Sequence, residues 1–78
     1  MDNKKIYNQA FIRTLEVKED QLAGLQYQGI PTWDSVGHMN LIGELEESFD
    51  IEMETDDVIA FSSYEKGIEI LGKYNIEI

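Results

Sequence analysis

A serine follows an aspartate in the stretch PTWDSVGHMNLIGELEESFD, where a helical pattern begins. Asp34 is a good N-cap residue, because its carboxylate can accept hydrogen bonds from the free amides of the first helical turn. Ser35 then takes the first helical position, where its hydroxyl is not needed for capping. A phosphate on that hydroxyl would lie at the positive end of the helix dipole. The pair therefore permits a phosphorylated or phosphodiester-linked serine, and simple capping is the alternative explanation.

The helix expected over residues 35–49 has two contrasting faces. At about 100° per residue, one face is apolar and points to the core, and the opposite face is acidic with Val36 set into it. A lone exposed valine is common, whereas a small apolar side chain within a ring of carboxylates is typical of a docking surface. Glu44 and Glu47 share this face with Val36, and Met39 lies on its border.

His38 falls on the core-facing arc near the start of this helix. One interpretation is a partly buried imidazole that is hydrogen-bonded to loop backbone. The other is that His38 lines the mouth of a cavity close to Ser35. Catalysis by Ser35 with His38 as base is disfavoured, because the two side chains point in different directions and the chain has no G-x-S-x-G turn. A chain of 78 residues also has little room for a deep enzyme cleft beside a core, so we expect a protein that is not an enzyme.

Apolar periodicity and capping residues predict four helices, at about residues 3–15, 35–49, 56–60 and 63–74. Asp2 or Asn3 is available as the first cap, Thr55 as the third, and a capping box from Ser62 to Glu65 precedes the last helix. The expected core residues are Leu41, Ile42, Leu45, Phe49, Ile59, Phe61, Ile68 and Leu71.

Residues 16–33 read as a long connection, since they hold two glycines and the only proline. A connection of this length has to pack apolar residues of its own, and the candidates are Leu22, Leu25, Tyr27, Ile30 and Trp33. We therefore expect one all-α domain over residues 1–78: a small four-helix bundle with three longer helices, a short third helix, and a long loop between the first two.

Sixteen acidic residues against six basic ones give a formal net charge of −10. Such a charge disfavours nucleic acid and anionic membranes, which are bound chiefly through Lys and Arg, and suits a partner with a basic docking surface. The chain has no cysteine, which excludes disulfides and thiolate metal sites. No apolar run approaches the ~20 residues of a membrane span, and no apolar signal core is present, so a cytoplasmic location is expected.

A calcium loop beginning at Asp50 is a weaker possibility. Acids occupy several ligand positions, but the sixth residue is Thr55 instead of glycine and the twelfth is Phe61 instead of glutamate. We expect no specific metal site.

With the helix order and the segment WDSVGHMNLIGELEESFDIEM in view, the chain resembles an acyl or peptidyl carrier protein over nearly its whole length. The family pattern is an Asp-Ser-aliphatic triplet at the start of the second of four helices, which here is Asp34, Ser35 and Val36, with valine in place of the commoner leucine. The segments YQGIPTW and GHM are more similar to discrete carriers of specialised pathways than to the general carrier of fatty acid synthesis.

The resemblance implies that Ser35 is the attachment point of 4'-phosphopantetheine, transferred from coenzyme A, and that Asp34 caps the helix and adjoins the target of the phosphopantetheinyl transferase. The arm would carry acyl or aminoacyl groups as thioesters, in fatty acid, polyketide or another specialised biosynthesis. Partners would be a loading ligase, synthases or acyltransferases with basic docking surfaces, and the carrier would be a monomer. The residues that the resemblance implies for docking on the acidic helix are Val36, Met39, Glu44 and Glu47. The alternative is an acidic helical adaptor that binds a protein partner and carries no prosthetic group.

Overall fold

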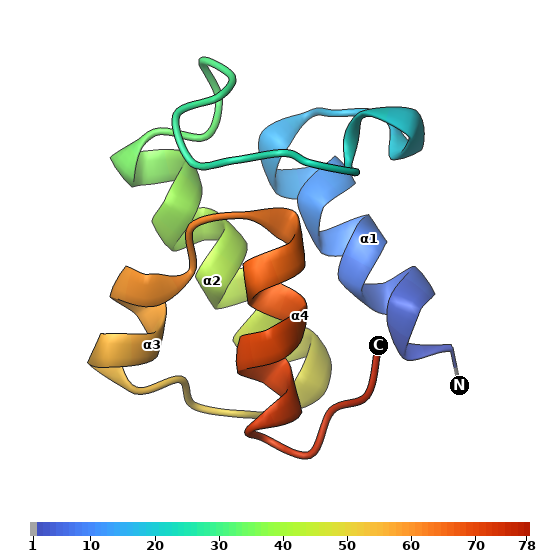
Figure 1. Cartoon of the computed structure of the whole chain (residues 1–78), viewed down its shortest axis with the longest axis vertical. Helices are drawn as coiled ribbons and strands as arrows, with labels where there is room; N and C mark the ends of the chain where they lie inside the picture. The colour runs from blue at the N-terminus through green and yellow to red at the C-terminus, as the bar shows by residue number, and fades with distance from the viewer. Residues whose placement is uncertain (1) are drawn as a thin grey trace.

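The computed structural model describes residues 2–78, and the chain is all-α, as predicted (Figure 1). The elements in chain order are α1 (Asn3–Leu15), the 3-10 turn η1 (Glu19–Gln21), α2 (Ser35–Phe49), α3 (Thr55–Ala60) and α4 (Tyr64–Gly72). Within residues 2–78 there is no strand, only one isolated antiparallel bridge between Gln26 and Ser63. No helix in this range is both long and apolar enough to cross a membrane.

The two longest helices begin and end where the sequence predicts. Asp2 caps α1 by accepting hydrogen bonds from the amides of Lys4 and Lys5, and Asp34 caps α2 by accepting one from the amide of Gly37. Each helix ends at a left-handed residue, Glu16 after α1 and Asp50 after α2. Strong caps and sustained apolar periodicity determine both helices locally.

The caps of the two later helices differ from the prediction. The N-cap of α3 is Glu54, without a side-chain cap bond, and Thr55 is the first helical residue. The cap of α4 is Ser63, whose hydroxyl accepts from the amide of Lys66 at 2.9 Å. The predicted capping box at Ser62 is thus wrong by one residue. The adjacent serines offer the same chemistry, and the bridge to Gln26 holds Ser63 in the extended geometry of a cap.

Aromatic side chains fill the centre of the molecule. Trp33, Phe11 and Phe61 are each at most 1% exposed, and their rings lie 5.4–6.4 Å apart. Among the predicted core residues, five are buried, namely Leu41, Ile42, Leu45, Phe61 and Leu71, while two are partly buried, Phe49 and Ile68.

The core prediction is wrong for Ile59, which is 75% exposed. Its helix turns Asp57 towards α4 instead, where the carboxylate meets Lys73 and Tyr74. Residues two apart on a helix lie about 200° apart, so burial of Asp57 directs Ile59 to solvent. A helix of six residues is too short for its apolar pattern to outweigh such an anchor.

The segment between α1 and α2 packs its own apolar residues, as expected. Leu22, Leu25 and Trp33 are buried, and Tyr27 and Ile30 are partly buried against the core. The segment crosses the top of the view in Figure 1. It pairs with the start of α4 through two backbone bonds of 2.9 Å, from the amide of Tyr27 to Ser62 and from that of Tyr64 to Leu25. These bonds hold Tyr27 beside Ser62, at the start of α4.

The two glycines of α2 differ in whether packing requires them. A Cβ at Gly37 would overlap the carbonyl oxygen of Thr32, so the absence of a side chain lets the helix pack against the chain that precedes it. Gly43 is exposed and a Cβ there would meet nothing within 4 Å. Gly37 is therefore a packing requirement, whereas packing places no such requirement on Gly43.

Candidate functional site

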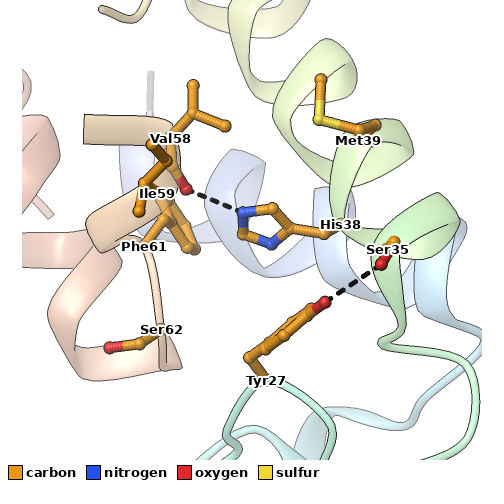
Figure 2. A pocket seen from close by; sticks show the side chains of 8 residues that line it. All are labelled: Tyr27, Ser35, His38, Met39, Val58, Ile59, Phe61 and Ser62. Carbon is orange, nitrogen blue, oxygen red and sulfur yellow. Dashed lines mark hydrogen bonds between the residues drawn. The ribbon is translucent and has the colours of Figure 1, made fainter. Parts of the chain in front are cut away.

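Ser35 is exposed at the first position of α2. Asp34 supplies the cap. Its carboxylate accepts a hydrogen bond from the amide of Gly37 at 2.8 Å, and its carbonyl oxygen accepts one from the amide of His38 at 2.8 Å. The serine hydroxyl is therefore not the capping group. Its side-chain neighbour is the hydroxyl of Tyr27, at 3.3 Å from Ser35 Oγ (Figure 2).

A pocket of about 370 Å³ begins beside Ser35 and extends to α3 and the connection that follows it. Ser35 and Met39 line it from α2, and Val58 and Ile59 from α3 (Figure 2). The complete lining is Tyr27, Ser35, His38, Met39, Val58, Ile59, Phe61 and Ser62. Hydroxyl groups stand at its edge and apolar or aromatic groups cover most of its wall.

His38 spans the inner side of this pocket, from α2 to α3 (Figure 2). The indole N–H of Trp33 donates to His38 Nδ1 at 2.9 Å, and His38 Nε2 lies 2.8 Å from the carbonyl oxygen of Val58. Because an indole nitrogen can only donate, Nδ1 must accept, and the imidazole proton sits on Nε2 and is donated to Val58. His38 is thus a partly buried histidine that is hydrogen-bonded to backbone, as the first interpretation held, but its backbone partner lies in a helix and not in a loop.

Both interpretations of His38 thus hold in part, since it also lines the pocket beside Ser35. With both ring nitrogens engaged by Trp33 and Val58, the imidazole makes no hydrogen bond to Ser35. The arrangement is not that of a serine nucleophile and its base, which requires a bond between the two side chains.

The surface around Ser35 contains three large exposed apolar side chains: Val36 at 70%, Met39 at 58% and Ile59 at 75% exposure. Val36 and Met39 are where the helical pattern predicts. Sequence reasoning missed Ile59, because the pattern assigned it to the core. The only available signal was its spacing from Asp57, and nothing in the sequence indicates that Asp57 is the buried one.

The two acids of the predicted docking set lie in different surroundings. Glu47 is exposed. Glu44 is half-buried beside α1, where its carboxylate lies 3.4 Å from the guanidinium of Arg13 and accepts from the hydroxyl of Ser48. The geometry therefore groups Glu47 with the open face of α2 and separates Glu44 from it.

Helix α3, which forms one wall of the pocket, is anchored through Asp57. The carboxylate lies 2.6 Å from Lys73 Nζ and accepts from the hydroxyl of Tyr74 at 2.6 Å. The hydrogen bond from Lys73, followed by that from Tyr74, lowers the pKa of Asp57 below its ordinary value. The same contacts raise the pKa of Lys73 and of Tyr74. The cluster joins the pocket wall to the C-terminal end of α4 through charge, in addition to the packing of the partly buried Val58 against the core.

Within residues 2–78, no group of three or more His, Cys, Asp or Glu side chains is arranged to hold a metal ion. Comparison with known proteins gives no relative: no family model, no curated protein and no solved structure matches the chain. The site's own geometry is therefore the basis for any statement about function.

Proposed function

We propose that the protein is a discrete carrier protein, which holds acyl or aminoacyl groups on a 4'-phosphopantetheine arm attached to Ser35. The observation that carries this proposal is an exposed serine hydroxyl at the start of α2, freed from capping by Asp34 and placed at the edge of a pocket. A serine that served only to start the helix would use its own hydroxyl as the cap.

The finer description of the fold, a four-helix bundle with a long loop between α1 and α2, belongs to this proposal. Its support is the element order: three longer helices, a six-residue α3, and a connection of residues 16–34 that packs its own side chains. This order places the serine helix second, where the carrier pattern has it.

The residues around Ser35 fit a phosphodiester. The hydroxyl is solvent-exposed, the amides of the first helical turn form the positive end of the helix, and Tyr27 offers a hydroxyl donor on the same side. On transfer, Ser35 Oγ forms a bond to the β-phosphorus of coenzyme A, the diphosphate linkage breaks to release 3',5'-ADP, and the serine proton passes to a base of the transferase. When bound, the arm supplies a thiol that a cysteine-free chain lacks, for thioester formation.

Docking on partner enzymes rests on the exposed end of α2 and on α3. Val36, Met39 and Ile59 give apolar contact, and Glu47 contributes negative charge to the face that carries Val36. A matching partner presents a small apolar recess with Lys or Arg around it, because charge steers the encounter and apolar burial holds the complex. The proposed partners are a phosphopantetheinyl transferase, then a loading ligase, synthases or acyltransferases of a specialised pathway. The chain is proposed to work as a cytoplasmic monomer.

The test is an intact mass before and after incubation with coenzyme A, magnesium and a promiscuous phosphopantetheinyl transferase. Ser35→Ala removes the acceptor, and Ser48→Ala is its matched control, since both serines are exposed on α2. We expect one phosphopantetheine to be added to the wild type and to Ser48→Ala, and none to Ser35→Ala. Circular dichroism checks that Ser35→Ala remains helical.

A folded, unmodified wild type that gains no mass with several transferases would contradict the proposal. That result would favour the adaptor, which uses the same apolar residues for a protein partner and needs no arm. A carrier is favoured here because an adaptor gives no reason for a free serine at the edge of a pocket.

A further inference from the structure

The pocket beside Ser35 is closed on its inner side. His38 is held at both ring nitrogens. Trp33 from the preceding segment donates to one, and the other lies against the carbonyl of Val58 in α3 (Figure 2). Its ring stacks on that of Trp33, with centroids 6.2 Å apart and planes at 18°, and meets the edge of Phe61 at 6.0 Å. Swinging the imidazole aside would leave two polar groups without partners, one of them the indole of a fully buried tryptophan.

The space behind this wall is already filled. Trp33 and Phe11 are fully buried and their rings lie 5.4 Å apart in an edge-to-face contact. Of the largest fully buried side chains that the structure describes, Phe61 alone reaches the pocket. Since protein interiors are close-packed, a chain that passed His38 would have to displace aromatic rings as well as break its hydrogen bonds.

The size of the pocket sets a limit on what it holds. At about 30 Å³ for each water-sized group, its 370 Å³ accommodate roughly a dozen such groups. Its lining combines apolar surface from Met39, Val58 and Ile59 with the hydroxyls of Tyr27 and Ser62 at the edge. That lining suits a small group with one polar end.

We infer that the pocket is a blind binding site for a short acyl or aminoacyl group, closed by His38, and that a long alkyl chain does not pass between the helices. As a statement about cargo, this inference rests on the proposed carrier function. As a statement about the pocket, it depends only on the wall that Trp33, His38 and Val58 form.

The absence of cysteine from the chain permits a test that needs no transferase. Ser35→Cys places a single thiol at the edge of the pocket, and alkyl methanethiosulfonates attach butyl, octyl and dodecyl chains to it as mixed disulfides. The readouts are the indole N–H resonance of Trp33, the methyl resonances of Met39 and Ile59, and the melting temperature.

We expect the butyl group to shift the Met39 and Ile59 methyl resonances. Octyl is within the dozen groups that the pocket accommodates, so we expect it to raise the melting temperature above that with butyl, whereas dodecyl should add no further rise. None of the three chains should shift the Trp33 indole resonance. A Trp33 resonance that moves progressively with chain length, with a melting temperature that climbs alongside it, would overturn the inference. Neither result depends on whether Ser35 accepts a phosphopantetheine, so the two proposals fail separately.

His38→Ala in the Ser35→Cys background removes the wall. We expect this variant, unlike its parent, to gain melting temperature from octyl to dodecyl as the longer chain enters the vacated space. If a folded His38→Ala shows no gain from octyl to dodecyl, His38 is not the closing residue and the inference is wrong. If this variant does not fold, the length series in the parent still decides the question.

Discussion

Helices α2 and α3 lie on either side of the pocket and are built in opposite ways. Helix α2 has a side-chain cap from Asp34 and fully buried leucines at Leu41 and Leu45. Helix α3 has six residues and no side-chain cap, and its buried residue is a carboxylate. Its apolar contact with the core comes from the partly buried Val58, while Ile59 is directed to solvent. The comparison teaches that the serine is carried by a helix with a side-chain cap and a buried apolar face, whereas the opposite wall is held mainly by polar contacts with its neighbours.

Truncating one apolar residue in each helix is expected to give the largest difference between them, measured as the free energy of unfolding. Leu45→Ala removes a fully buried side chain from α2 and should lower the free energy of unfolding by about 2–5 kcal/mol. Ile59→Ala removes an exposed side chain from α3 and should change it by no more than about 0.5 kcal/mol. Urea denaturation measures both, and similar losses in the two variants would mean that the face of one helix is wrongly assigned.

The two glycines of α2 sharpen the account of its packing. Gly37→Ala forces a methyl group against Thr32 and Leu15 and should cost about 1–3 kcal/mol as overpacking. Gly43→Ala is the matched control, since its Cβ meets open space, and it should stabilise the helix by up to about 1 kcal/mol. Melting temperatures that move in the same direction for both variants would contradict the close contact at Gly37.

A charge placed on either helix tests whether both belong to the docking surface. Val36→Asp and Ile59→Asp each put a carboxylate in place of an exposed apolar side chain, so stability should change little. Each should lower kcat/KM for transfer of the phosphopantetheine by about tenfold, equivalent to about 1.4 kcal/mol of lost contact. If kcat/KM is unchanged for Ile59→Asp and lowered for Val36→Asp, this docking contact is restricted to α2.

The smallest effect concerns the anchor of α3. The pKa of Asp57 is lowered by Lys73 and Tyr74, so its ionised form stabilises the fold at pH values above the ordinary carboxyl pKa of about 3.9. This contribution is lost as the pH falls through the lowered pKa of the folded state. Asp57→Asn should therefore melt at a slightly lower temperature than the wild type at pH 7, with a difference that shrinks below about pH 4. A difference that stays constant down to pH 2.5 would show that ionisation of Asp57 is not its source.

Much of the fold is readable from the sequence where local signals are strong. The bounds of α1 and α2, the cap at Asp34 and the burial of Leu41 and Leu45 follow from capping chemistry and helical period. The exposure of Val36 follows from the same period. These features depend on residues within a few turns of one another.

The remainder depends on contacts between segments far apart in the sequence. Nothing local indicates that Asp57 meets Lys73, that Val58 offers its carbonyl to His38, or that Tyr27 lies beside Ser35. These three contacts place α3, close the pocket and complete the surroundings of the serine. The sequence therefore identifies the candidate serine, and only the folded chain reveals the pocket beside it.

The most direct test of the central claim is a mass map of the protein purified from its native cells. Cleavage on the amino side of aspartate releases residues 34–49, which contain both Ser35 and Ser48, and fragmentation distinguishes the two serines. The account predicts that Ser35 carries a phosphopantetheine, free or with a short acyl or aminoacyl group, and that Ser48 is unmodified. A peptide recovered only in its unmodified form, from cells in which a known carrier protein is found modified, would contradict it.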